Sequence, residues 1–118
     1  MTQKEKRDFR YTSKWKRFRV KMKKLAQGID FITMKPLTKA WNLHHLDMKD
    51  VNYKDITNPD RFIALNEDTH KIVHWLYPIY KKDKDVIARL EYILMLMETY
   101  TSDRTGKAKN KTRAELSK

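Results

Sequence analysis

Residues 42–47 read Asn-Leu-His-His-Leu-Asp, and residues 69–74 read Thr-His-Lys-Ile-Val-His. These two stretches hold all four histidines of the 118-residue chain. The second stretch predicts a helix, on which His70 and His74 lie on one face because they are four positions apart, so they can bind one metal ion together. If the His-His pair supplies a third ligand, its other member is left free for chemistry.

Short extended segments are expected on the N-terminal side of this helix. Residues 40–46 predict a strand that arrives at the His-His pair, and residues 62–65, Phe-Ile-Ala-Leu, predict a second strand. Residues 29–37 read as extended with Pro36 near a turn, and they are expected to form a hairpin with residues 40–46. The Asp- and Asn-rich composition of residues 47–61 predicts a loop.

A basic helix is expected near the N-terminus. Residues 1–11 read as a polar, mobile lead-in, and Thr12-Ser13 can then cap a helix that runs to Gln27 and stops at Gly28. One face carries an apolar stripe of Trp15, Phe18, Met22 and Leu25. The cations between these residues are the expected DNA-binding set: Lys14, Lys16, Arg17, Arg19, Lys21, Lys23 and Lys24.

Two helices are expected after the second strand. The first should run from about Asp68 to Leu76 or Tyr80, with Pro78 ending or kinking it. The second should cover residues 86–100, whose apolar residues share a face.

Charge is concentrated at the ends of the chain. The sequence has 27 Lys/Arg and 15 Asp/Glu, a net charge of +12, of which residues 1–28 contribute +9 and residues 102–118 contribute +4. Positive ends around a nearly neutral centre indicate that the ends bind a phosphate backbone on either side of a central reaction site. A solvated basic surface with no partner would have the same composition.

Composition also sets exclusions. The absence of cysteine excludes disulfides and a thiolate zinc site, and it suits a reducing cytosol. No apolar run follows the N-terminal residues and none approaches 18 residues, so neither a signal peptide nor a membrane span is expected.

The order of strand, His-His, loop, short strand and helix resembles the motif of HNH endonucleases, closest to the small HNH proteins of bacteriophages and prophages. The resemblance lies in residues 42–47, 58–65 and 69–74, with residues 30–37 resembling the approach to the motif. It covers about residues 29–76. It implies an α+β fold with a ββα-metal core and hydrolysis of phosphodiester bonds.

The resemblance also assigns roles to the four histidines. His44, His70 and His74 match the ligands of one divalent ion (Zn, Mg, Mn or Ni), and His45 matches the general base that takes a proton from the attacking water. Neutral imidazoles bind zinc-like ions well, and an imidazole near its ordinary pKa is a competent base at neutral pH. Adjacent strand residues point to opposite faces, so His44 and His45 can serve one site only if the strand twists or ends there.

The chain departs from the family pattern just before the short apolar run. The family has Asn there and this sequence has Arg61, which cannot accept a hydrogen bond as an Asn carbonyl does. Asn58, three residues earlier, can take its place, and Asn66 lies on the other side of the run; the alternative role for Arg61 is contact with phosphate. Asp47 is a lesser candidate, either beside the metal or as a cap within the loop.

The sequence thus predicts an α+β protein in four parts: a basic N-terminal arm and helix (1–28), an HNH core (29–80), a C-terminal helix packing on that core (81–101) and a basic, disordered tail (102–118). Its expected function is that of a metal-dependent DNA endonuclease that contacts mainly the backbone, in the cytoplasm of a bacterial host. The resemblance suggests a phage-encoded protein of DNA processing or packaging, beside a terminase. The alternative is a non-catalytic nucleic-acid-binding module whose three histidines hold a structural zinc.

Overall fold

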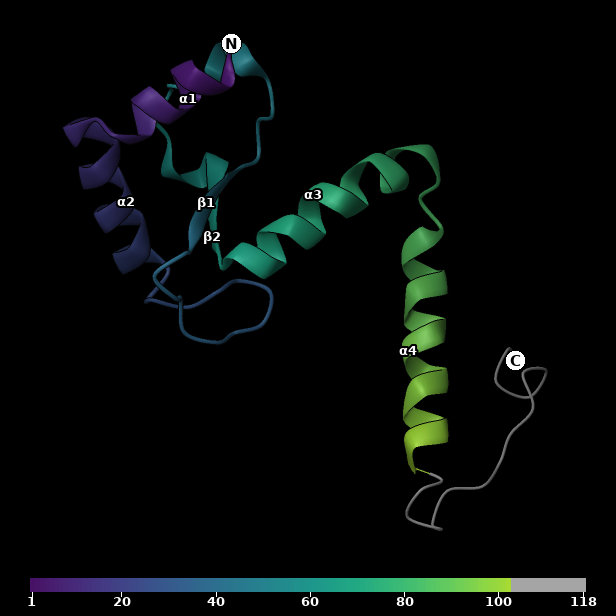
Figure 1. The fold of residues 1–118 in the computed structure, drawn as a ribbon. Helices are drawn as coiled ribbons and strands as arrows, with labels where there is room; N and C mark the ends of the chain where they lie inside the picture. The colour runs from purple at the N-terminus through teal and green to yellow at the C-terminus, as the bar shows by residue number, and fades with distance from the viewer. Residues whose placement is uncertain (103–118) are drawn as a thin grey trace. The chain divides into compact units, whose positions relative to one another are not determined.

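The computed structural model describes residues 1–102 (Figure 1). The protein is α+β, as expected, and β1 (Asn42–His45) and β2 (Phe62–Leu65) form a two-stranded antiparallel sheet. The helices are α1 (Gln3–Arg10), α2 (Ser13–Leu25), α3 (Glu67–Lys82) and α4 (Val86–Ser102), with short 3-10 helices at Asp50–Asn52 and Pro59–Arg61. The chain divides into two compact units, Met1–His74 and a second that begins at Trp75. Apart from Ser102, the tail that was expected to be disordered lies outside the described residues.

The first residues form a helix, so the prediction of a mobile lead-in was wrong. The Thr2 hydroxyl accepts a hydrogen bond from the Glu5 N–H at 3.1 Å, and the Glu5 carboxylate accepts one from the Thr2 N–H at 3.4 Å. This reciprocal pair satisfies two N–H groups that the start of a helix otherwise leaves unpaired. Phe9 then fixes α1 to the core, since its ring is buried 5.6 Å from that of Trp15.

The basic helix α2 agrees with its prediction at the start and ends slightly earlier. Thr12 caps it by accepting a hydrogen bond from the Trp15 N–H at 3.2 Å. The helix ends at Leu25 rather than Gln27, because Gln27 and Gly28 adopt φ values of 56° and 69°, outside the right-handed helical region. Glycine takes up such a conformation at little cost.

The strand pairing differs from the predicted hairpin. Strand β1 pairs with β2, which places His44 opposite Ile63 and His45 opposite Phe62. Segment 29–37 instead folds back on itself through an isolated bridge between Ile29 and Pro36. Pairing β1 with β2 puts apolar side chains of both strands in one core with α1 and α2. That core consists of Phe9, Trp15, Phe18, Met22, Leu37, Trp41, Leu43, Phe62 and Ala64.

Helix α3 starts directly after β2, while α2 lies on the other side of the strand pair (Figure 1). It continues through Pro78 to Lys82, so the predicted end at Leu76 or Tyr80 was too early. In the helix α4, no residue between Val86 and Ser102 is buried, and the packing of this helix on the core stays a prediction. No helix within residues 1–102 is long and apolar enough to cross a membrane.

Candidate functional site

Three of the four histidines meet at one point. His44 comes from β1, and His70 and His74 come from one face of α3. Each offers a ring nitrogen, and these three nitrogens lie within 4.8 Å of one another. The Nε2 atoms of His70 and His74 are 2.9 Å apart, close to the separation of about 3.3 Å that two ligands have on a tetrahedral ion with bonds of about 2.05 Å. The geometry therefore allows all three to hold one ion.

The electrostatics of this cluster also fit a metal. Burial, followed by the nearby His74 and His70, lowers the pKa of His44 to about 4. Burial, followed by His74, likewise lowers the pKa of His70. Neutral rings keep the lone pairs that a metal needs. In addition, His44 Nδ1 is buried without a hydrogen-bond partner, a costly arrangement unless something binds the ring. The donor set is thus suited to zinc or a similar divalent ion.

A buried carboxylate fixes the start of α3 and so the two helix histidines. Asp30 is fully buried, and one of its oxygens accepts hydrogen bonds from the N–H groups of Ile32 and Thr33, both at 2.8 Å. The other accepts from the Asn66 N–H at 2.7 Å and from the Thr69 hydroxyl. Burial by itself raises the pKa of Asp30, but the four hydrogen bonds outweigh it and hold the pKa well below its ordinary value. Asp30 was not among the residues expected at the site.

His45 lies in an aromatic cage on the other face of β1. Its ring stacks on Tyr53, with centroids 4.6 Å apart and planes 12° apart, and on Trp15, at 5.9 Å and 5°. The edge of Phe62 approaches it at 4.8 Å. Strand β1 ends at His45, and the ring lines the same hollow as His70 and His74. The requirement that the strand end at the His-His pair is therefore met.

The hydrogen bond of His45 defines its tautomer. Nε2 lies 3.2 Å from the carbonyl oxygen of Tyr53. A carbonyl can only accept, so Nε2 carries the hydrogen, and the neutral ring keeps its lone pair on Nδ1. Burial lowers the pKa of His45; the Tyr53 carbonyl raises it, and Lys6 and Arg10 lower it again.

The hollow beside the histidines has more basic than acidic side chains in its lining. It measures about 350 Å³, and its charged lining residues are Lys6, Arg10, Arg19 and Lys49 together with Asp47 and Asp50. Arg10 donates a 2.7 Å hydrogen bond to the Tyr53 hydroxyl, so α1 braces the cage around His45. Lys6 and Arg10 were missed as site residues because residues 1–11 read as a lead-in, and Tyr53 was missed because residues 47–61 read as a loop. The Thr2-x-x-Glu5 capping pattern was the available signal for this helix.

Asn58 and Arg61, the residues expected to support catalysis, do not join the histidine cluster. The Asn58 side chain caps the second 3-10 helix by accepting from the Asp60 N–H at 3.0 Å. Arg61 lines a small separate hollow beside His45, where its guanidinium lies 3.9 Å from Asp47 and 4.0 Å from Asp55. Asp47 accepts from the Lys49 N–H at 3.0 Å, which is the loop-capping role.

The basic face of α2 is exposed at six of its seven cations, the exception being Arg19. Arg19 lies 3.9 Å from the centre of the Trp41 ring and donates a 2.7 Å hydrogen bond to the Trp41 carbonyl. Arg19 therefore stabilises the fold as well as adding to the positive charge of α2.

No protein-family model, no curated protein and no solved structure matches this chain.

Proposed function

We propose that this protein is a metal-dependent DNA endonuclease of the HNH type, with β1, β2 and α3 as its ββα-metal core. The observation that carries the proposal is the arrangement of the four histidines. Three have ring nitrogens that converge on one point, and the fourth, His45, lines the same hollow with a lone pair on Nδ1. A structural metal site has no need of a fourth histidine held in this way.

The residues account for the parts of phosphodiester hydrolysis. A divalent ion held by His44, His70 and His74 would supply positive charge for the scissile phosphate and for the leaving oxygen. His45 Nδ1 accepts the proton of the attacking water, and the Tyr53 carbonyl holds the ring through Nε2–H. Because the pKa of His45 is lowered, the ring is unprotonated at neutral pH and ready to act as a base.

The same proposal includes DNA as the partner. The six exposed cations of α2 contact backbone phosphates beyond the hollow, which gives affinity with little sequence information. The resemblance to phage HNH proteins suggests DNA processing or packaging in the cytoplasm of a bacterial host, beside a terminase.

Supercoiled-plasmid cleavage tests the proposal. Purified protein is incubated with plasmid and Mg²⁺, Mn²⁺, Ni²⁺ or Zn²⁺, with EDTA and His45→Ala as controls. Nicked or linear plasmid is expected with at least one metal, and both controls should abolish it. Plasmid that is bound but stays intact under every metal would contradict the proposal.

One observation favours a second function, a nucleic-acid-binding module with structural zinc. His45 is stacked between two rings and hydrogen-bonded to a backbone carbonyl, as a histidine that only supports a core would be. In that case His45→Ala changes stability but not the effect of the protein on DNA, and the plasmid is retarded without being cut.

A further inference from the structure

A second hollow adjoins the histidine hollow in the unit Met1–His74. The two share five lining residues: Arg10, Trp15, Arg19, Asn42 and His70. The second hollow measures about 660 Å³ and extends to Tyr11 and Lys16. A ligand whose reacting group lies at His70 therefore has room beside it for a further chemical group of substantial size.

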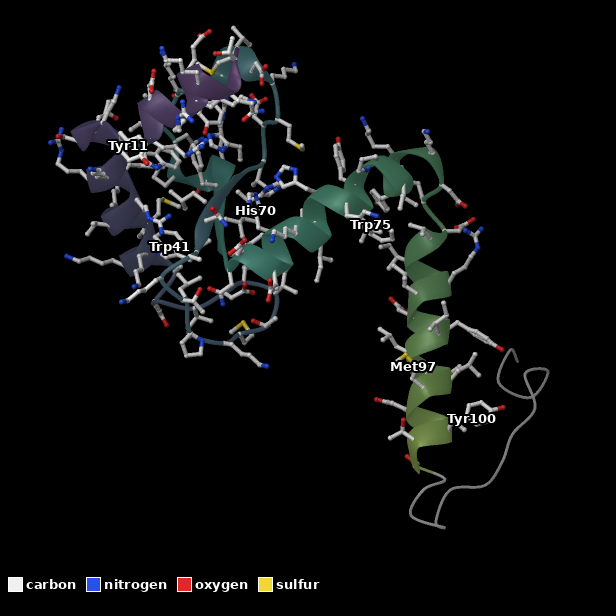
Figure 2. All side chains as sticks on the ribbon, viewed as in Figure 1. Tyr11, Trp41, His70, Trp75, Met97 and Tyr100 are labelled. Atoms are coloured by element: carbon white, nitrogen blue, oxygen red, sulfur yellow. The ribbon has the colours of Figure 1, made fainter. Side chains whose placement is uncertain are left out.

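The lining of this hollow combines cations with one exposed ring. Arg10, Lys16 and Arg19 contribute positive charge, whereas Lys71 is paired with the acidic lining residue Glu67 at 2.9 Å. Tyr11 is 70% exposed. Figure 2 labels Tyr11, Trp41 and His70, which reach this region from the end of α1, the segment before β1 and the first turns of α3.

The floor and rim of the hollow are held in place without any ligand. Trp41 is buried and is covered by the Arg19 guanidinium, which also bonds to its carbonyl. Tyr11 is the residue that ends α1, and its N–H bonds to the Asp8 carbonyl at 3.1 Å. Its ring is thus presented from a fixed backbone, with Lys16 Nζ 6.0 Å from the ring centre.

We infer that this hollow binds an unpaired nucleotide next to the scissile phosphate, with its base stacked on Tyr11 and its phosphate held by Arg10 and Lys16. A cationic groove with an exposed aromatic ring is the arrangement by which proteins bind single-stranded nucleic acid. Bases within a duplex have both faces covered by their neighbours, so only an unpaired base can offer a face to Tyr11. The inference rests on the proposed nuclease function, and it names the substrate as DNA that is single-stranded at the cleavage point.

Binding to an inactive protein tests this inference separately from cleavage. Full-length His45→Ala protein is titrated into an oligodeoxynucleotide that carries 2-aminopurine, either single-stranded or annealed in a duplex. Anisotropy gives the affinity, and the fluorescence of 2-aminopurine reports stacking. The single strand should bind more tightly than the duplex, with quenching of the probe. Adding Tyr11→Ala should weaken single-strand binding roughly tenfold and remove the quenching, whereas Tyr11→Trp should retain both.

Tyr77→Ala is the matched control. Tyr77 is also an exposed tyrosine beside a lysine, with Lys81 Nζ 5.0 Å from its ring, but it lies in the second unit of the chain. Its loss should leave single-strand affinity unchanged. Equal affinity for single strand and duplex, or Tyr11→Ala protein that binds like its parent, would overturn the inference. Tyr11-dependent binding of single-stranded RNA but not DNA would overturn the choice of DNA.

The outcomes separate this inference from the nuclease proposal. Wild-type protein that cuts neither plasmid nor single-stranded circular DNA under any metal, combined with Tyr11-dependent binding of the single strand, would overturn the nuclease proposal and support the nucleotide site. Wild-type protein that cuts plasmid, combined with single-strand binding that is unchanged in Tyr11→Ala protein, would support the nuclease proposal and overturn the nucleotide site.

Discussion

His44 and His45 are neighbours on one strand, yet they lie in opposite environments. His44 is 6% exposed and faces His70 and His74, with ring centroids 5.2 and 4.9 Å away. His45 faces α2 and the loop after β1, where Trp15 and Tyr53 enclose its ring. Since adjacent strand residues point to opposite faces, a single strand can place one ring in the histidine cluster and the next ring against α2 and the following loop.

The two rings differ in their hydrogen-bond partners rather than in the direction of their pKa shifts. Both rings have a lowered pKa because of burial. The difference lies in their partners: His44 Nδ1 has none, whereas His45 Nε2 is committed to the Tyr53 carbonyl. A ring in a cluster of nitrogens is suited to coordinate a metal, and a ring held by one nitrogen is suited to transfer protons through the other.

Removing each histidine gives the largest expected effect. His45→Ala should lower the cleavage rate about 10³-fold and leave the bound metal unchanged, because a positioned base contributes about 10²- to 10⁴-fold. His44→Ala should abolish both metal binding and cleavage, because only two of the three metal ligands remain. Metal content after gel filtration and plasmid cleavage measure the two effects. Loss of metal from His45→Ala protein would contradict the proposal that His44 binds the metal and His45 does not.

Loosening the scaffold of α3 should disturb the His44 side of the strand while leaving the cage of His45 in place. Asp30→Asn replaces one carboxylate oxygen by an NH₂ group that cannot accept hydrogen bonds from Asn66 and Thr69. We expect a loss of about 2–3 kcal/mol in the free energy of unfolding at pH 7, measured by urea denaturation. Asp60→Asn, at an exposed position, is the control and should change it by less than about 0.5 kcal/mol.

The pH dependence of this effect has a definite sign. Burial raises the pKa of Asp30, but its hydrogen bonds, led by that from Thr69, give a net lowering in the folded protein. A carboxyl group whose pKa is lower when folded stabilises the protein above its unfolded pKa of about 3.9 and loses that contribution as the pH falls further. The gap between wild type and Asp30→Asn should therefore narrow below about pH 4. A gap that widened there would show that Asp30 is not ionised in the fold.

The sequence predicted the meeting of His70 with His74 better than the surroundings of His45. His70 and His74 share a face through helical periodicity alone, and Phe62–Leu65 was recognised as a strand from its apolar run. The cage depends on contacts between distant residues, such as Tyr53 with Arg10, 43 positions apart. Residue patterns do not encode such contacts. For the same reason, they predicted a hairpin of residues 29–37 with 40–46, whereas the pairing of β1 with β2 was implied only by the resemblance to a ββα-metal core. The capping box at Thr2 and Glu5 was local and could have been read.

Opening the cage should have a smaller effect than removing the base. Tyr53→Leu removes the ring that stacks on His45 but keeps the backbone carbonyl that holds Nε2. We expect cleavage to fall roughly tenfold with metal content unchanged, because misplacing a reacting group by about 1 Å costs up to about 10²-fold. Tyr53→Phe retains the ring and loses only the hydroxyl that Arg10 binds, so it should stay within about threefold of wild type. Equal losses in both variants would assign the effect to the Arg10 hydrogen bond.

The smallest effect concerns the cations of α2, the helix whose Trp15 stacks on His45. Lys23 is exposed, and Lys23→Ala should weaken DNA binding about threefold and reduce the slope of log affinity against log salt by about 0.9, as expected for one lost phosphate contact. Arg19→Ala should instead lower the free energy of unfolding by about 1 kcal/mol, because it removes the contacts with Trp41. Salt titrations by anisotropy, with urea denaturation of the same proteins, separate the two. If Lys23→Ala left the salt slope unchanged, α2 would serve as a wall of the His45 cage and not as a DNA contact.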